Sequence, residues 1–206
     1  MLSEVCTKKK NKGKTMKKLL SSVVLGASVL ALAACGEDES TLKVGASNTP
    51  HAVILEQVKP ILEEQGITLE IEPYQDYILP NQDLESGDLD ANYFQHIPYF
   101  EAQKSEFDYD FANAGGIHIE PIGIYSKKYA SLEELPEGAT ILLSNSVADH
   151  GRMLSLLEAQ GLIKLADGID KTTAELKDIV ENPKNFVFDH DTAAELLFQM
   201  YDNEEG

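Results

Sequence analysis

Hydrophobic and polar positions alternate in recognisable patterns after residue 40. Residues 41–46 form a short strand pattern closed by small residues, and residues 67–72 alternate apolar with polar side chains as a strand does. Between them, apolar residues recur at helical spacing over residues 51–65, with Pro60 inside the helix and Gly66 at its end. A strand, a helix and a strand within about thirty residues predict a parallel sheet of the α/β class.

The stretch Leu89–Tyr99 opens as a strand and passes directly into a helix. Pro98 stops the strand and suits the first turn of a helix, which we expect to continue to about Phe107. Four ring-bearing side chains gather within seven residues: Tyr93, Phe94, His96 and Tyr99. Rings and an imidazole at such a junction favour a pocket for a small, partly apolar ligand, while the alternative is ordinary core at the end of a buried strand.

The remaining patterns predict a second group of shorter elements. The glycines at 115 and 116 should break the chain, and Pro121 should separate two extended pieces that cross between lobes. Short helices are expected over 81–85 and 131–136, longer ones after Arg152 and over 172–180 and 191–201, and strands over 139–143 and 186–188.

A polar turn over Ser144–Arg152 lies between a predicted strand and a predicted amphipathic helix. Open α/β sheets bind ligands at such turns, and the N–H groups of a helix start favour an anion. Arg152 is the only arginine in the chain, and its guanidinium suits bidentate capture of a carboxylate. The alternative is a structural or surface ion pair.

The N-terminal region has the pattern of a secretory signal. Lysines precede an apolar run over Leu19–Ala34, which ends in small residues before Cys35. We expect residues 1–34 to be a signal peptide outside the fold, with residues 1–15 a spurious extension, because Met16 already begins a complete signal. Cys6 would then be irrelevant. Cys35 would receive lipid, and residues 35–40 would form a lipidated tether.

Charge and cysteine content narrow the classes of partner. The whole chain has 35 acidic and 17 basic residues, of which Glu4 and seven lysines come before Leu19. The part after residue 34 therefore has 34 acidic and 10 basic residues, which gives it a net charge near −24. Nucleic acid and anionic lipid headgroups reward positive charge, so neither is an expected partner. Without Cys35, that part has no cysteine for a disulfide or a cysteine zinc site.

Several motifs together resemble the NlpA-type methionine-binding lipoproteins, the substrate-capturing subunits of ABC importers. They occur in the order Cys35, Tyr77–Asn81, Asp88–Tyr99, His118–Ser126 and Gly151-Arg152, and the resemblance runs from Cys35 to the end of the chain. It implies a periplasmic-binding-protein-like fold of type II, with lobe 1 over 41–120, lobe 2 over 121–206 and a ligand cleft between them.

The resemblance also implies the ligand and its contacts. The protein would bind L-methionine, or a related small ligand, without a cofactor and without a chemical step. It would be anchored by lipid on the extracytoplasmic face of a membrane and would pass the ligand to ABC permease and ATPase subunits. Arg152 would hold the carboxylate, and the side-chain pocket would be lined by Tyr77, Phe94, His96, Tyr99 and His118. Candidate acceptors for the ammonium group are Glu120, Asn145 and Asp149.

Two departures from the family pattern qualify this expectation. The family's turn is typically Asn-Asp-Pro-x-Asn-x-Gly-Arg, whereas this chain has Asn-Ser-Val-Ala-Asp-His-Gly-Arg over 145–152. Family members also continue for roughly seventy residues beyond Gly206, so we expect the second lobe to be incomplete and ligand binding by this chain to be weak.

Three other functions stay open at this point. A methionine-containing dipeptide or another apolar amino acid is the nearest alternative ligand. A zinc-binding lipoprotein is less favoured, because none of the five histidines has a spacing such as His-x-x-x-His, and we expect no metal site. A hydrolase is least favoured, since Ser144 or Ser146 near His150 lacks the sequence context of a nucleophile.

Overall fold

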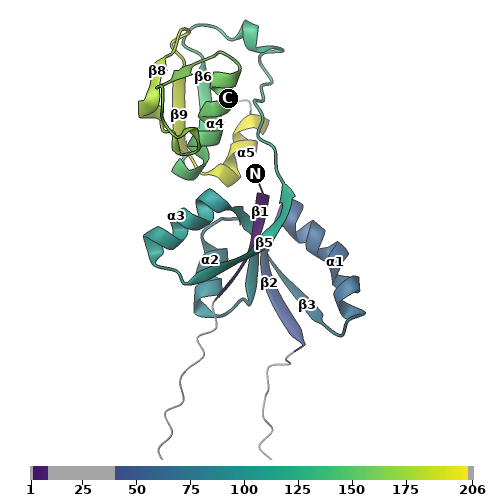
Figure 1. Cartoon of the computed structure of the whole chain (residues 1–206). Helices are drawn as coiled ribbons and strands as arrows, with labels where there is room; N and C mark the ends of the chain where they lie inside the picture. Colours follow the sequence, from purple (N-terminus) through teal and green to yellow (C-terminus); the bar gives the residue numbers. More distant parts are fainter. Residues whose placement is uncertain (1, 9–39, 204–206) are drawn as a thin grey trace, which may run out of the picture.

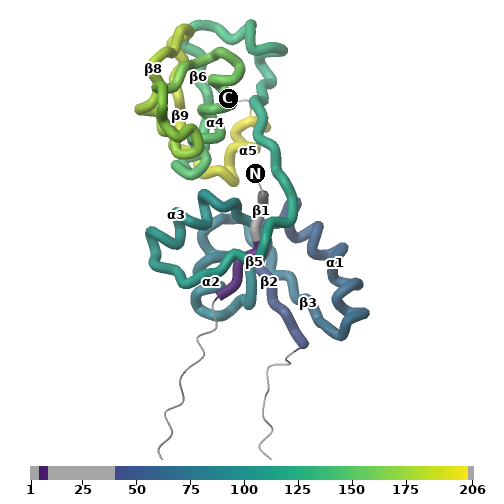
Figure 2. Tube along the Cα trace, viewed as in Figure 1, coloured from purple at the N-terminus to yellow at the C-terminus, as the bar shows by residue number. Residues whose placement is uncertain are grey.

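The computed structural model describes residues 2–8 and 40–203, which form two bodies of unequal size (Figure 1). The larger body holds a five-stranded sheet, and the smaller body is built around helix α4 (Val147–Ala159). Residues 120–126 have no regular structure and run between the bodies (Figure 2). Cys35 and most of the predicted signal and tether lie outside the described residues, and the predicted lobe boundary at 120–121 stays a prediction.

The larger sheet has the strand order β3-β2-β4-β1-β5. Its strands are β1 (Leu2–Lys8), β2 (Thr41–Ser47), β3 (Thr68–Tyr74), β4 (Ala91–His96) and β5 (Phe111–Ile119). Strand β2 is parallel to both β3 and β4, whereas β1 is antiparallel to both of its neighbours. The predicted α/β class and the predicted parallel strand–helix–strand unit are confirmed.

Three helices flank this sheet: α1 (Val53–Glu63), α2 (Leu79–Ser86) and α3 (Ile97–Phe107). An irregular turn, Asn48–Ala52, in which Thr49 is extended, precedes α1, and Pro60 lies inside α1 as predicted. Pro80 and Pro98 occupy the first turns of α2 and α3, where the missing N–H leaves no helical hydrogen bond unmade. The helix predicted from residue 97 to about 107 is confirmed.

A buried cluster of amides fixes α2 to β4. Asn92 Nδ2 donates to Asn81 Oδ1 at 2.9 Å and to the Pro80 carbonyl at 3.1 Å. Gln95 Nε2 also donates to Asn81 Oδ1, at 2.9 Å. Because all three side chains are buried, each lost bond would leave a polar group unsatisfied in the core. The cluster therefore sets the end of β4, from which the ring-bearing residues emerge.

Strand β5 corrects the prediction of a break at the glycine pair. The strand runs without interruption from Phe111 to Ile119, through Gly115 and Gly116. Its pairing with β1 shifts register on either side of this pair, and Gly115 takes φ 148°, a conformation that favours glycine. The glycines therefore allow bulges within a paired strand and do not end it.

The expectation that residues 1–34 lie outside the fold is wrong for Leu2–Lys8. This segment is β1, which pairs with β4 on one side and with β5 on the other. Cys6 is fully buried in a cluster with Leu84 and Phe111, so it is part of the core. The lysines that follow obscured a strand pattern only a few residues long. Removal of residues 1–34 as a signal peptide stays a prediction.

The smaller body packs α4 against short strands (Figure 1). Strand β6 (Thr140–Ser144) is parallel to β9 (Val187–Thr192), and β7 (Lys164–Leu165) is antiparallel to β8 (Ile179–Glu181). A final helix, α5 (Leu197–Asp202), ends the described chain. The core of this body is apolar and is formed by Leu154, Leu157, Leu162, Ile163, Leu165, Ala174 and Phe186.

Helices predicted in the smaller body are shorter than expected. The segment 172–180 contains two 3₁₀ turns, Lys171–Thr173 and Leu176–Asp178, and the start of β8. Asp170 and Asp178 accept hydrogen bonds from nearby backbone N–H groups, which compete with helix formation. The segment 191–201 is also only partly helical, because β9 extends to Thr192. The other 3₁₀ turns are Leu132–Glu134 and Ala194–Leu196.

The strand predicted at 139–143 is confirmed as β6, within one residue at each end, and the one predicted at 186–188 is a longer strand, β9. Among the described residues, no helix combines the length and the apolar character that a membrane crossing requires.

Candidate functional site

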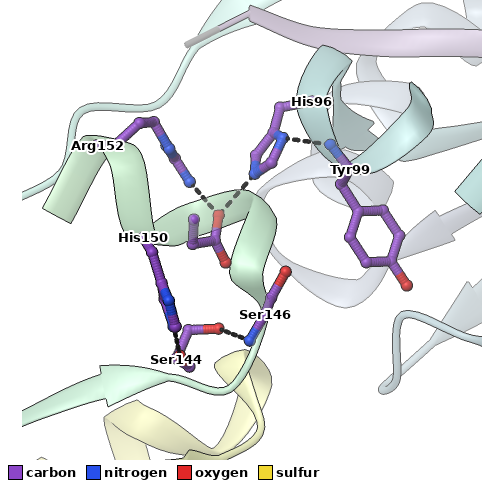
Figure 3. Close-up of polar contacts among 7 residues, drawn as sticks. His96, Tyr99, Ser144, Ser146, His150 and Arg152 are labelled. Atoms are coloured by element: carbon purple, nitrogen blue, oxygen red, sulfur yellow. Dashed lines mark hydrogen bonds and ion pairs between the residues drawn. The ribbon is translucent and has the colours of Figure 1, made fainter. Parts of the chain in front are cut away.

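One carboxylate joins the two bodies. Asp149, in the first turn of α4, accepts hydrogen bonds on Oδ1 from His96 Nε2 at 2.7 Å and from Arg152 Nη2 at 2.6 Å (Figure 3). His96 lies between β4 and α3, and its Nδ1 accepts the Tyr99 N–H at 3.1 Å, so Nε2 carries the proton. The residues predicted at the strand–helix junction and at the polar turn therefore meet directly.

The placement of Arg152 differs from the prediction. Helix α4 begins at Val147, so residues 147–152 are helical and Arg152 lies in the second turn rather than at the helix start. Asp149 and Arg152 are three residues apart and consequently share one helix face. Gly151 is needed because a Cβ there would lie 2.3 Å from the Thr172 carbonyl oxygen. Close packing on the 3₁₀ turn, rather than a loop conformation, explains this glycine.

Electrostatics keep the Asp149 carboxylate charged. Burial would raise the pKa of Asp149, but the hydrogen bonds from His96 and Arg152 outweigh burial and hold the pKa below its usual value of 3.8.

The guanidinium of Arg152 has only part of its hydrogen-bonding capacity used by the pair with Asp149. Its Nε is buried and has no hydrogen-bond partner within the described residues. An incoming acceptor such as a carboxylate would satisfy that N–H.

A row of rings continues from His96 into the larger body. The ring centroids of His96 and Tyr99 are 6.4 Å apart, those of Tyr99 and Phe94 are 6.1 Å apart, and those of Phe94 and Tyr77 are 5.9 Å apart. The Tyr99 hydroxyl donates to the Tyr77 carbonyl at 2.8 Å, which ties the loop before α2 to α3. Burial, with nearby acidic groups adding to it, raises the pKa of Tyr99 to about 12, so its hydroxyl stays protonated as a donor.

His118 and Glu120 lie in a second group rather than in this row. Tyr93 and His118 are joined by a contact of 2.5 Å between the hydroxyl and Nδ1, and His118 Nε2 lies 3.2 Å from Glu120 Oε1. His51 completes the group, with its Nε2 3.8 Å from the same Glu120 oxygen. The sequence prediction included His118 and Glu120 but assigned no role in the site to His51.

Asn145 stands apart from both groups. Its side chain is exposed, and it lines a hollow of about 510 Å³ together with His150, His190 and Asp191. Of the residues predicted for the ligand site, Asn145 alone lines this hollow. Glu120 and Asp149, by contrast, lie in the groups described above, so the three predicted acceptors for an ammonium group are not brought to one place.

The missed residue His51 left a detectable signal in the sequence. It lies four residues after the end of β2, much as His96 ends β4 and Tyr77 lies three residues after the end of β3. Carboxyl ends of parallel strands meet at one edge of a sheet, where α/β proteins bind ligands. Once the strand–helix–strand unit is recognised, His51 is predicted to lie at that edge.

The residues of a possible hydrolytic triad do not assemble as a triad. His150 directs Nε2 to the Ser144 carbonyl oxygen at 2.8 Å, and the Ser144 hydroxyl accepts the Ser146 N–H at 2.9 Å (Figure 3). Asp149 is bonded to His96 and Arg152 instead of His150. These contacts close the turn between β6 and α4, which is a structural role.

Comparison with known proteins gives one consistent group. A family model described as NlpA lipoprotein matches residues 42–205. The methionine-binding lipoprotein MetQ of Bacillus subtilis (strain 168) is 46% identical over 198 residues, which are 93% of this chain and 72% of that protein. Across the curated relatives that it matches, the chain spans between 59% and 72% of their length.

Solved structures agree in fold. A pheromone cOB1 precursor/lipoprotein of the YaeC family from Enterococcus faecalis V583 is 57% identical, with a TM-score of 0.79 over 81% of this chain and 69% of that chain. A nutrient binding protein from Burkholderia cenocepacia bound to methionine is 37% identical, with a TM-score of 0.73 over 79% of this chain and 68% of that chain.

Proposed function

The chain belongs to the NlpA lipoprotein family, a family of substrate-binding lipoproteins that includes the methionine-binding lipoprotein of Bacillus subtilis, and we propose that it captures L-methionine for an ABC importer. The protein would act on the extracytoplasmic face of a membrane, held there by lipid on Cys35. It would pass its ligand to the permease and ATPase subunits without chemical change. A lipid anchor would keep the binding protein close to its transporter without a membrane-spanning helix.

The observation that carries this proposal is the juxtaposition of Arg152 with the row of rings. The buried Arg152 Nε without a hydrogen-bond partner is suited to an amino-acid carboxylate, because a charged acceptor satisfies it best. The rings that begin at His96 and end at Tyr77 suit a thioether, which is apolar and polarizable and gains from contact with ring edges. The two features are joined through Asp149, which is hydrogen-bonded both to His96 at the start of the row and to Arg152.

In the proposed site the pocket residues keep the roles predicted for them. Arg152 holds the carboxylate, and the rings enclose the ligand side chain: Tyr77, Phe94, His96, Tyr99 and His118. For the ammonium group, Asp149 is the strongest of the predicted acceptors, because it is buried beside Arg152 with its charge retained. Glu120 is half-buried, whereas Asn145 is exposed and faces a different hollow.

The two-body arrangement supports binding by closure. The extended segment 120–126 lies between the bodies, and the rings and the guanidinium come from different bodies. A ligand that contacts both sides stabilises the closed form by its differential affinity for that form.

The proposal is tested by calorimetric titration of the full chain carrying Cys35→Ser, in mild detergent. L-methionine should give a saturable one-to-one signal, at least tenfold tighter than D-methionine, L-leucine or glycyl-methionine. If glycyl-methionine binds more tightly than L-methionine, the ligand is a dipeptide instead of the amino acid. Silence with all four compounds, in a chain that unfolds cooperatively, would overturn the proposal.

A further inference from the structure

Two imidazoles and a carboxylate converge beside the row of rings. His51, His118 and Glu120 each offer one ligand atom, and these atoms all lie within 4.8 Å of one another. We propose that this group is a binding site for a divalent transition metal of the zinc class, with His51 Nε2, His118 Nε2 and the Glu120 carboxylate as ligands. His118 and Glu120 also belong to the methionine site proposed above, so zinc binding is tested without methionine.

The distances are close to those of a bound tetrahedral metal. Zinc binds imidazole nitrogen and carboxylate oxygen at about 2.0–2.2 Å, which places neighbouring ligand atoms about 3.3–3.6 Å apart. Glu120 Oε1 lies 3.2 Å from His118 Nε2 and 3.8 Å from His51 Nε2. The ring centroids of the two histidines are 5.1 Å apart with an interplanar angle of 60°, so the rings are not stacked. Small side-chain movements would complete the geometry.

The second nitrogen of each imidazole is already held by a hydroxyl. His51 Nδ1 lies 2.5 Å from Ser47 Oγ, and His118 Nδ1 lies 2.5 Å from Tyr93 Oη. Metal-bound histidines characteristically use their other ring nitrogen for such an outer contact, which fixes the ring and its tautomer. Here Nδ1–H would donate to the hydroxyl, leaving the lone pair of each Nε2 for the metal.

Burial favours the protonation state that a metal requires. The His51 side chain is 4% exposed, and burial lowers the pKa of His51 to about 4, although Glu120 opposes this shift. His118 Nε2 is buried and lies 3.2 Å from Glu120 Oε1 without forming a hydrogen bond within the described part of the chain, and a metal ion between the two atoms would satisfy both.

The carboxylate and the surroundings supply charge and access. Two neutral imidazoles and one carboxylate would leave a divalent ion with one net positive charge, which suits a chain with a formal net charge of −18. Glu120 is 43% exposed, so the fourth position can open to solvent and hold a water molecule. Two histidines, one carboxylate and a water form an established zinc ligand set.

The test is a calorimetric titration of the full Cys35→Ser chain with zinc chloride, without methionine and in a buffer that does not bind metal. One equivalent of zinc should bind and raise the melting temperature. His51→Gln should weaken zinc binding by at least about 100-fold, and Glu120→Gln by at least about tenfold. His190→Gln is the matched control, because His190 lies in the other body, and it should change the affinity less than threefold.

Cobalt(II) absorption gives an independent readout of the ligand geometry. The parent chain should show the intense visible bands of tetrahedral cobalt, and His51→Gln should lose them. If His51→Gln does not fold, the half-exposed Glu120→Gln decides the question. Zinc binding that survives both substitutions, or no zinc binding by the folded parent chain, would overturn the proposal.

Discussion

The two bodies of this protein differ in what they bring to the proposed ligand site. The larger body supplies rings, and they are fixed by regular structure: β4 and α3 carry Phe94, His96 and Tyr99, with buried amides behind them. The smaller body supplies charge, and it does so from one helix face that holds Asp149 and Arg152.

This difference separates two kinds of recognition. Ring contacts are weak and tolerant, so they suit a pocket that is formed before the ligand arrives. A guanidinium is directional, and its hydrogen bonds to a carboxylate strengthen when closure removes the surrounding water. We infer that the larger body selects the ligand side chain, and that the smaller body determines how much affinity closure adds.

The largest expected effect comes from removing the charge of the smaller body. Arg152→Ala should weaken L-methionine binding by about 30- to 1,000-fold, because a buried carboxylate would lose its charged partner. Isothermal titration measures the loss. Lys177→Ala is the matched control, since Lys177 is an exposed cation of the same body, paired with Glu175. Binding of Arg152→Ala within threefold of the parent would contradict the assignment.

A smaller effect compares how the two bodies tolerate the same substitution. In Gly151→Ala the new Cβ would lie 2.3 Å from the Thr172 carbonyl oxygen, whereas in Gly45→Ala it would lie 2.5 Å from Leu89 Cδ1. A backbone carbonyl cannot rotate away as a side chain can. We expect Gly151→Ala to lower the free energy of unfolding by about 2–3 kcal/mol and Gly45→Ala by about 1 kcal/mol.

Urea unfolding of both variants, followed by circular dichroism, measures this difference. If Gly45→Ala lowers the free energy of unfolding as much as Gly151→Ala or more, the packing of α4 on the 3₁₀ turn is no tighter than the packing of β2.

The smallest effect is a pH dependence at the contact between the bodies. The pKa of Asp149 is lower in the folded protein than the ordinary value of 3.8, despite burial, because His96 and Arg152 hydrogen-bond to the carboxylate. Its contribution to stability is therefore fully present above pH 3.8 and is lost as pH falls through the lower folded pKa. We expect the stability difference between parent and Asp149→Asn, about 1 kcal/mol, to be constant from pH 5 to 7.

Urea midpoints measured at several pH values test this expectation, and the difference should shrink only below about pH 3.8. If the stability difference between the parent and Asp149→Asn already falls between pH 7 and pH 5, a group other than Asp149 controls the contact between the two bodies.

The larger body was predictable from the sequence because its elements are long and periodic. The strand–helix–strand unit and the helix from residue 97 follow from apolar spacing and from the two prolines that open α2 and α3. The smaller body was harder, since Asp170 and Asp178 bond to nearby backbone and replace a helix by 3₁₀ turns. Such bonds depend on side-chain geometry, which spacing alone does not reveal.

The site divides in the same way. Phe94, His96 and Tyr99 are neighbours in sequence, so their grouping in space was expected. The contact of His96 with Asp149 and the convergence of His51 on His118 join distant segments. Sequence spacing contains no information about such pairs until the order of the strands is known. The predicted roles of the site residues stay predictions.

Strand β1 has a consequence for how the larger body is held together. It lies between β4 and β5, yet residues 9–39, which include the predicted lipidation residue Cys35, connect it to the rest of the fold. Cleavage before Cys35 would turn its pairing into a bimolecular association, and the effective concentration that the connection provides would be lost. The sheet would then behave as a split protein: Leu2–Lys8 would be the complementing fragment, and its departure would leave the edges of β4 and β5 unpaired.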